Sequence, residues 1–442
     1  MERSFKTDAQ TLKDLQIQGV GGKSIFGFFD RTVSDGGQEA LRELFYTPLA
    51  DIDGIRERQE AIAMADTEAD FAYDRLVLKD LERYLGTYRS LKEKPDFTKK
   101  MRNLFVRHSP AYYYKERSVR ETLETLIALR GYLKALLKRR PSHQGLIARE
   151  ADVASCIGQL LKPRRHGRKD IRITVFNIDR YDYVIRITLK EKIKELLQFL
   201  YELDAYRSVA IVQNEAALVF PEFHAKGETN GVEVKGLYHL FNDRPVPNDV
   251  VLSRRENLWF LTGANMAGKS TLIKALSVAV YLAHIGFPVP AESMRLDLMD
   301  GLFTTINLDD DIDLGYSHFY HEAARLKAIV DQLGPDSNAL IVLDELFKGT
   351  NYQDSYDAIF RVIRAFSGMP NGPYVVISSH LTELASELEG LENIALKCMD
   401  TRSDVDGLPV FTYKIQQGVA QEKLGMWLLE KSGLFNALGK HL

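Results

Sequence analysis

The chain of 442 residues is long enough for two or three domains, each with a sizeable core. Its 45% hydrophobic and 27% charged content is typical of a globular protein and excludes a disordered or fibrous one. The two cysteines, Cys156 and Cys398, lie far apart, which excludes a disulfide framework or zinc site and favours a reducing cytoplasm. The start is polar and the apolar run 276–290 is broken by His284 and Pro288, so neither export nor a membrane span is expected.

The formal net charge of −3 conceals an uneven distribution. Residues 99–172 contain 19 Lys and Arg against 6 Asp and Glu, a net charge of +13 that leaves −16 for the rest of the chain. A basic region of this kind is the electrostatic footprint expected of a nucleic-acid contact. It is equally typical of a solvated helical face, so charge alone leaves both interpretations open.

The amino-terminal half has the periodicity of helices. Apolar residues recur at three- and four-residue intervals over 26–64, which predicts short packed helices. Longer helices are predicted over 70–91, over 119–137 with an end at Pro141, and over 189–206. Between the last two, partial alternation of apolar and polar residues over 171–187 predicts a small hairpin.

From about residue 219 the pattern changes to alternating strands and helices. Apolar runs at 258–261, 339–343 and 374–377 are strand candidates, and helical segments separate them. This alternation predicts a parallel sheet with helices on both faces.

The strongest chemical signal follows the first of these strands. Residues 263–271 fit the pattern G-x-x-x-x-G-K-[ST], and a helix is expected over 269–284. Glycines in such a loop let the backbone wrap phosphates, and the helix N-terminus attracts the anion. Lys269 would reach the β- and γ-phosphates, and the Ser270 hydroxyl would ligate Mg²⁺. The predicted binding residues for ATP and Mg²⁺ are therefore Gly263, Ala264, Asn265, Met266, Ala267, Gly268, Lys269, Ser270 and Thr271.

A pair of carboxylates follows the second strand candidate. Asp344 would complete the shell of a Mg²⁺ ion held by the loop, and it is the second predicted metal ligand beside Ser270. Glu345, next in sequence, is placed to polarise the attacking water and is the predicted general base. An Asp-Glu pair is by itself typical of a solvated strand end, but its position downstream of the loop favours the catalytic interpretation.

A series of segments, all in one order, resembles the MutS family of DNA mismatch-repair ATPases. The loop looks like that family's TGPNMGGKST. After it come P-A-E-S, S-x-F-x-x-E, L-D-E, G-T-N and S-H-x-x-E-L, which begin at residues 290, 317, 343, 349 and 379. Segments at 24–32 and 219–223 also resemble the start of the family's helical core and the entry to its ATPase domain.

The resemblance implies a two-part fold, α/β plus all-α. A P-loop ABC-type ATPase domain with a mainly parallel sheet would occupy 213–442, preceded by a helical core and lever domain over 1–212 with a basic arm at about 99–172. The family is dimeric, and its S-x-F-x-x-E serine reaches the nucleotide of the other protomer. This role would fall to Ser317, for which a helix N-cap is the alternative.

The resemblance also implies roles for two further residues. His380 matches the histidine that senses the γ-phosphate and the water, so the expected catalytic set is Glu345, His380 and Lys269. Val246 lies beside a segment similar to the one that packs against adenine, and we expect it to contact the base. The alternative for Val246 is a small hydrophobic residue at a strand end, with no role in binding.

The sequence also departs from the family pattern. Ala264 replaces a proline and Ala267 a glycine, but neither position supplies a phosphate-binding side chain, so binding is expected to survive. After Glu345 the usual Ile-Gly-Arg is replaced by residues 346–348, Leu-Phe-Lys. The family's mismatch-binding and connector domains would precede this sequence, and the Phe-Pro-Glu at 220–222 lies in the wrong domain for a mismatch wedge. We therefore expect no intrinsic mismatch reading.

Two functions stay open at this stage. The first is a cytoplasmic homodimeric ATPase that couples hydrolysis in composite sites to duplex DNA binding, together with repair or recombination proteins. The second is a dimeric nucleotide switch that remodels or recruits a protein or ribosomal partner. ABC-type transport is disfavoured because no membrane segment is visible in the sequence. For the first function, the predicted contacts to the DNA backbone are Lys162, Arg164, Arg165, Arg168 and Lys169.

Overall fold

The three apolar runs form neighbouring strands of one six-stranded sheet, ordered β10-β9-β4-β8-β7-β6. Every neighbouring pair is parallel except β10 and β9, which confirms the prediction of a mainly parallel sheet. The strands are β4 (Leu258–Thr262), β6 (Gly301–Thr305), β7 (Ala339–Asp344), β8 (Tyr374–Ser378), β9 (Ile394–Ser403) and β10 (Pro409–Gln417).

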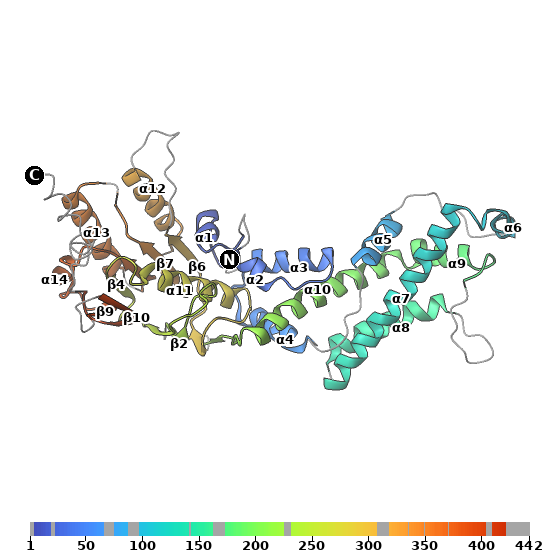
Figure 1. Cartoon of the computed structure of the whole chain (residues 1–442), viewed down its shortest axis with the longest axis horizontal. Coiled ribbons are helices and arrows are strands. Elements are labelled where there is room, and N and C mark those ends of the chain that lie inside the picture. The colour runs from blue at the N-terminus through green and yellow to red at the C-terminus, as the bar shows by residue number, and fades with distance from the viewer. Residues whose placement is uncertain are drawn as a thin grey trace, which may run out of the picture. The chain divides into compact units, whose positions relative to one another are not determined.

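The computed structural model describes residues 4–18, 23–65, 75–86, 97–140, 143–161, 173–224, 231–306, 318–334, 336–348, 350–369, 371–403 and 409–420. The chain divides into two compact units, whose elements Figure 1 labels. Unit 1 takes its residues from 1–28, 47–59 and 213–442, and unit 2 from 29–46 and 60–212. The expected domain boundary at 212–213 coincides with one junction, and the assignment of the two functional domains stays a prediction.

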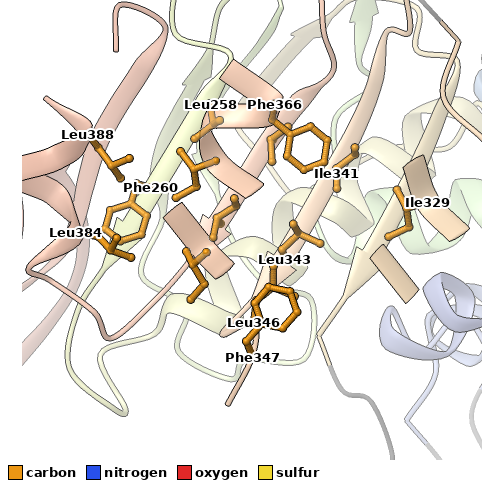
Figure 2. Close-up of a cluster of buried hydrophobic side chains, with 14 of the residues drawn as sticks. Leu258, Phe260, Ile329, Ile341, Leu343, Leu346, Phe347, Phe366, Leu384 and Leu388 are labelled. Carbon is orange, nitrogen blue, oxygen red and sulfur yellow. The ribbon is translucent and has the colours of Figure 1, made fainter. Parts of the chain in front are cut away.

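Helices cover both faces of the six-stranded sheet, as the alternating pattern predicted. Phe260, Ile341 and Leu343 meet side chains of three helices in one buried cluster (Figure 2). Strand side chains alternate between faces, so Leu340 and Val342 point the other way, where α11 packs against β6, β7 and β8. The helices of the cluster are α12 (His318–Val330), α13 (Tyr352–Ser367) and α14 (Leu384–Leu388), and that of the opposite face is α11 (Lys269–His284).

The amino-terminal segment pairs with the edge of this sheet, a contact that the sequence analysis did not predict. Lys6 forms a parallel bridge with Gly301 of β6. In the helix α1 (Ala9–Asp14), Asp14 accepts hydrogen bonds from the Thr304 hydroxyl at 2.7 Å and from the Ile306 N–H at 2.9 Å. These long-range polar contacts place the first residues of the chain in unit 1.

A second, smaller sheet of unit 1 has the order β1-β5-β2-β3. Its β2 is antiparallel to β3 and β5, while β1 and β5 are parallel. The strands are β1 (Glu222–Phe223), β2 (Val232–Leu237), β3 (Asn248–Leu252) and β5 (Ser293–Leu296). The loop between β2 and β3 carries Val246, so this sheet positions the residue that was expected to contact the base.

The remaining described elements are helical, which confirms the prediction for the amino-terminal half. The predicted helix over 119–137 is the central part of α7, and that over 70–91 contains α5, with its outer residues beyond the described ranges. Among the described residues, no helix is long and apolar enough to cross a membrane. The helices are α2 (Ile25–Phe29), α3 (Asp35–Tyr46), α4 (Ile52–Met64), α5 (Arg75–Gly86), α6 (Phe97–Val106), α7 (Pro110–Arg139), α8 (Gln144–Leu160), α9 (Ile178–Tyr183), the π-helix η1 (Val184–Thr188) and α10 (Lys190–Glu215).

The predicted hairpin over 171–187 is wrong over its described part, because residues 178–188 are α9 and the π-helix η1. The buried residues Ile178, Tyr181, Ile185 and Leu189 recur every three or four positions, which is the helical period. The β-branched and aromatic composition of the segment suggested strands, and packing on one helical face overrides that preference.

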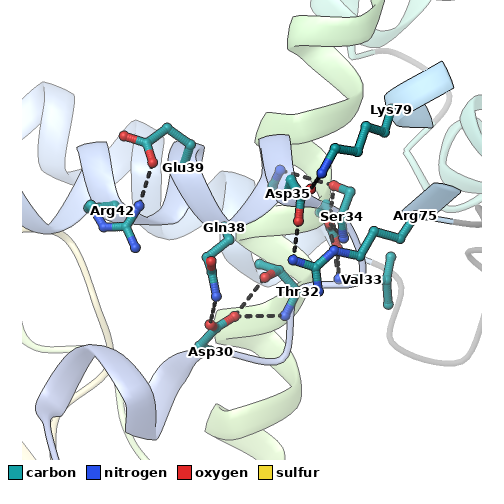
Figure 3. Close-up of polar contacts among 12 residues, drawn as sticks. Asp30, Thr32, Val33, Ser34, Asp35, Gln38, Glu39, Arg42, Arg75 and Lys79 are labelled. Atoms are coloured by element: carbon teal, nitrogen blue, oxygen red, sulfur yellow. Dashed lines mark hydrogen bonds and ion pairs between the residues drawn. The ribbon is translucent and has the colours of Figure 1, made fainter. Parts of the chain in front are cut away.

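A buried carboxylate joins the start of α3 to the middle of α10 in unit 2. Asp204 accepts the Ser34 hydroxyl at 2.7 Å and the backbone N–H groups of Ser34 and Val33 at 3.0 and 3.2 Å. Figure 3 labels Val33 and Ser34 and shows the neighbouring ion pairs of Asp35 with Arg75 and Lys79. An added Cβ on Gly37 would lie 2.1 Å from the Asp204 carboxylate, so this close approach requires glycine.

Candidate nucleotide site

The loop after β4 depends on glycine backbone geometry at both ends. Gly263 has φ +153° and Gly268, the N-cap of α11, has φ +101°. An added Cβ would lie 3.2 Å from the Met399 side chain at the first position and 3.3 Å from the Tyr413 ring at the second. Backbone of this kind is what lets a loop curve around an anion at a helix N-terminus.

Lys269, the first residue of α11, is turned back over the loop. Its side chain is 4% exposed, and Nζ donates to the carbonyl oxygens of Gly263 at 2.7 Å and Ala264 at 3.3 Å. The same Nζ lies 3.6 Å from Glu345 Oε1. Burial lowers the pKa of Lys269, and the nearby carboxylates of Glu345 and Asp344 oppose that effect. The predicted phosphate-binding lysine and the predicted general base therefore meet in one site.

The sheet register brings β7 and β8 together at the same edge. Asp344 is the register partner of Ser378, whose hydroxyl donates to the Asp344 carboxylate. The Glu345 N–H in turn donates to the Ser378 carbonyl at 3.1 Å. Ser378 is thus a positioning residue for both carboxylates, and the sequence analysis did not single it out. Its position next to the S-H motif is the signal that could have found it.

Two side chains contact the Glu345 carboxylate directly. The φ of Glu345 is +49°; its Oε1 contacts His380 Nε2 and its Oε2 forms an ion pair with Lys348. Burial by itself would raise the pKa of Glu345, but the hydrogen bonds and charges of His380 and Lys348 lower it to about 2. Glu345 is therefore anionic throughout the neutral range, and His380 lies in direct contact with it.

A cavity of about 470 Å³ opens over the loop. Lys269, Ser270, Thr271 and Glu345 line it together with Val246. Other side chains that line the cavity were not predicted, because they come from three separate segments without a motif of their own. These are Tyr238, His239, Arg244, Met399 and Tyr413.

One side chain in the cavity wall joins β3 to β10 by hydrogen bonds. Asn248 Nδ2 donates to the Tyr413 carbonyl at 2.9 Å and to the Val246 carbonyl at 3.1 Å. Its Oδ1 accepts the Ile415 N–H at 2.8 Å. Asn248 thereby fixes the wall of the cavity that Val246 and Tyr413 line.

The oxygen atoms at this edge suit a magnesium ion that arrives with a nucleotide. Ser270 offers a hydroxyl and Asp344 a carboxylate, and oxygen ligands of this kind are what Mg²⁺ prefers. Within the described ranges, no group of three or more His, Cys, Asp or Glu side chains could hold a metal by itself. Mg²⁺ bound by one or two protein oxygens and by substrate phosphates fits such a donor set.

Two sets of predicted residues lie outside the described residues. Ser317, expected to act in the other protomer, belongs to the stretch 307–317. The predicted DNA contacts Lys162, Arg164, Arg165, Arg168 and Lys169 belong to the stretch 162–172. Both assignments stay predictions.

Comparisons with known proteins agree with the motif series. The model of MutS domain III matches residues 10–333, and that of MutS domain V matches residues 259–438. DNA mismatch repair protein MSH7 of Arabidopsis thaliana is 26% identical, over 98% of this chain and 43% of that protein. DNA mismatch repair protein MutS of Ruegeria sp. is 31% identical, over 48% of this chain and 24% of its own length.

A third relative gives the same picture. DNA mismatch repair protein MutS of Petrotoga mobilis is 30% identical, over 61% of this chain and 33% of its own length. The chain therefore spans less than half the length of each of these relatives.

Proposed function

The chain belongs to the MutS family, and from that premise we propose that it is an ATPase whose nucleotide cycle is coupled to binding of duplex DNA. The observation that carries the ATPase proposal is the meeting of buried Lys269 with Glu345 over a glycine-bounded loop. The three relatives are named DNA mismatch repair proteins, which supports the coupling to DNA. The site is proposed to act in DNA repair or recombination in the cytoplasm.

The proposed chemistry follows from the charges around the cavity. The Lys269 ammonium binds the β- and γ-phosphates in exchange for its present loop carbonyls. Mg²⁺, when bound through Ser270 and Asp344, neutralises phosphate charge. The Glu345 carboxylate, ionised at neutral pH, orients and polarises the attacking water. His380 contacts Glu345 and is therefore placed beside the same water.

The ion pair with Lys348 has a consequence for this chemistry. A carboxylate with a pKa of about 2 is a weak base, because the best general base has a pKa near the working pH. Movement of Lys348 away from Glu345 would raise the pKa of that carboxylate and strengthen it as a base. We therefore propose that the present arrangement is the resting form of the site.

The proposed active unit is a homodimer in which Ser317 completes the partner's nucleotide site. The test mixes two inactive variants, Lys269→Ala and Ser317→Ala, after exchange of subunits has been demonstrated. A mixed dimer contains one site with neither defect, so partial ATP turnover is expected to return. If no mixing ratio restores turnover, each protomer has a self-contained site and the dimer proposal fails.

The proposed DNA contacts are the basic residues of 162–172, which would neutralise backbone phosphates. Their support is the net charge of +13 over 99–172. Phosphate contacts position a protein on a duplex but carry no base information, so we propose binding without mismatch preference. Salt-dependent binding of a labelled duplex, measured by anisotropy, tests this part. Absence of such binding would favour a nucleotide switch that acts on a protein partner.

A further inference from the structure

One face of α6 in unit 2 is apolar and exposed. Phe105 is 84% exposed, and Met101, four residues earlier, shares its side of the helix. Arg102 and Val106 form a second exposed pair at the same spacing, while Asn103 faces inward and is buried. A single exposed apolar side chain is ordinary, but neighbouring ones such as Met101, Phe105 and Val106 are typical of an interaction site.

A further exposed aromatic side chain lies on a segment that contacts α6. Asn103 Nδ2 donates to the Val175 carbonyl at 3.2 Å and to Asp179 at 2.6 Å. Asp179 also forms an ion pair with Lys115 of α7 at 2.8 Å. These contacts bring α6, the first turns of α7 and the segment before α9 together, and Phe176, 58% exposed, directly follows Val175 in sequence. Tyr113, also exposed, lies about 200° around α7 from Lys115 and therefore faces away from this contact.

The charges at this end favour an anionic partner. Arg102 and Arg107 flank Phe105 in sequence and are exposed, and within the described ranges no ion pair joins either of them to a carboxylate. The end also belongs to the segment 99–172, whose net charge is +13. A second copy of the same basic surface would be repelled, so charge complementarity argues against self-association here.

We propose that Phe105 and Phe176, with Arg102 and Arg107, form a binding surface for unpaired nucleotides of a DNA strand. Exposed aromatic rings stack on base faces, and guanidinium groups beside them neutralise the phosphates. These two rings and two arginines are called the aromatic–basic surface. The proposal deepens the proposed DNA-binding function, since it names the DNA structure that this end of unit 2 recognises.

Unpaired nucleotides fit this surface better than an intact duplex. In a duplex the faces of the bases are covered by their neighbours, and only phosphates and groove edges are accessible. Stacking on a protein ring needs bases that are already splayed or single-stranded. The aromatic–basic surface therefore binds a single strand, or the single-stranded part of a branched or gapped duplex.

The first test compares two single strands that differ only in their bases. The full-length protein is titrated with a labelled oligothymidylate and with an abasic strand of equal length, at one salt concentration, by anisotropy. Because both carry the same phosphates, the difference isolates stacking. Wild type is expected to bind the base-containing strand about ten-fold more tightly, and equal affinities would overturn the proposal.

The second test changes the ring at one position. Phe105→Ala and Phe105→Leu should each lower affinity for oligothymidylate about ten-fold, about 1.4 kcal/mol, while Phe105→Trp should retain it. The leucine variant keeps an apolar contact and removes stacking, so it separates base stacking from docking of an apolar protein surface. Tyr46→Ala, which removes an exposed ring of α3 that lies outside the surface, is the matched control and should change nothing. Circular dichroism checks that every variant is folded.

A third measurement uses the new indole directly. In Phe105→Trp, the indole fluorescence should be quenched by oligothymidylate and not by the abasic strand, because only bases can stack on it. If Phe105→Leu binds like wild type, or if the Phe105 variants alter only sedimentation of the protein, the surface serves a protein contact and the proposal is overturned.

The outcomes separate this proposal from the DNA-binding function on which it rests. A lower affinity for oligothymidylate in Phe105→Ala, with duplex affinity unchanged, supports the aromatic–basic surface and leaves the duplex contacts of 162–172 intact. Salt-sensitive duplex binding without any preference for bases over abasic strands overturns the aromatic–basic surface alone. Absence of binding to every nucleic acid overturns both.

Discussion

The sheet edge of unit 1 and the exposed end of unit 2 place functional groups in two different ways. At the sheet edge, parallel strands bring Lys269, Asp344 and His380 together from segments far apart in sequence, because the carboxyl ends of parallel strands meet at one edge. At the end of unit 2, long helices are tied by single polar residues such as Asp179, and the side chains left outside form the surface.

This difference explains which functional residues can be recognised from the sequence alone. A loop that curves around phosphate needs particular backbone conformations, so Gly263 and Gly268 stand at fixed spacing and form a motif. A surface such as that of Phe105 needs only exposure, which no spacing rule encodes. The predictions that follow separate the two regions, beginning with the change expected to have the largest effect.

The largest effect is expected at the nucleotide site. Lys269→Ala should lose ATP binding. Among the described residues of the cavity wall, Lys269 is the only cation that is buried against the loop. Glu345→Gln should bind ATP normally and hydrolyse it at least ~100-fold more slowly, since an amide cannot accept the proton of water. Equilibrium binding and steady-state turnover measure the two defects. A fully active Glu345→Gln would remove Glu345 as the base.

The next effect concerns the basic segment of unit 2. Replacing Arg164, Arg165 and Arg168 with Glu should lower duplex affinity about a hundred-fold. The slope of log affinity against log salt concentration should become less negative by about 0.9 for each phosphate that is no longer neutralised. ATPase activity without DNA should stay unchanged, because the nucleotide site lies in unit 1. Lys190→Glu with Lys194→Glu, outside the basic segment, is the control and should bind duplex as wild type does.

Much of the fold of unit 1 could be predicted from the sequence. The apolar runs of β4, β7 and β8 and the helix α11 were predicted within a residue or two, because buried parallel strands are uniformly apolar and the loop motif fixes the start of the helix. Strands such as β2 and β9 were missed. Strand β2 alternates buried and exposed residues and β9 mixes apolar and polar ones, so neither forms the uniform apolar run that identified the other strands.

The geometry of the candidate nucleotide site could be predicted only where it depends on the loop and the strand ends. Asn248 and Tyr413 shape the cavity through a contact between residues 165 positions apart, which sequence alone does not indicate. The ion pair between Lys348 and Glu345 was also missed, because it forms where the backbone has positive φ values at Glu345 and Phe347. In unit 2, the hairpin error at 171–187 shows that residue composition is a weaker guide than the period of the buried positions.

Removal of one carboxylate should loosen unit 2 without touching nucleotide binding. Asp204→Ala leaves the Ser34 hydroxyl and the N–H groups of Ser34 and Val33 without their acceptor in a buried place. We expect a loss of about 3 kcal/mol in the free energy of unfolding. Urea unfolding followed by circular dichroism measures it, and Asp204→Asn, which keeps one acceptor oxygen, should lose less. An unchanged unfolding midpoint in Asp204→Ala would contradict this role.

Acid should weaken unit 1 through one buried histidine. His284 Nδ1 lies 3.0 Å from the Leu49 carbonyl, and Nε2 accepts the Met299 N–H at 3.3 Å, so a second ring proton would face a donor. Burial lowers the pKa of His284 to about 4, against about 6.5 in the unfolded chain. A lowered folded pKa means that stability present above pH 6.5 is lost as pH falls toward 4.

Between pH 7 and pH 5 this histidine should cost about 2 kcal/mol of stability, at about 1.4 kcal/mol per pH unit. Urea unfolding followed by tryptophan fluorescence reports on unit 1, because Trp259 lies in β4. His284→Gln, which cannot be protonated, should show a smaller loss over the same range. An equal pH dependence in the variant and the wild type would assign the effect to other groups.

The smallest expected effect is the difference between matched and mismatched duplexes. The proposed contacts at 162–172 are to phosphates, whose arrangement is nearly the same in both duplexes. Detection of a mismatch requires an apolar wedge inserted at a deformable step, which bends the duplex and yields a large difference in affinity. The aromatic–basic surface could act as such a wedge only if its rings entered the duplex, so the comparison also tests where those rings bind. For the 442-residue chain we expect affinities for a G·T duplex and its matched control to agree within a few-fold, by anisotropy at one salt concentration. A ten-fold preference for the G·T duplex that disappears in Phe105→Ala would show that these rings read paired DNA. Binding of unpaired nucleotides and binding of duplex DNA would then be one mode.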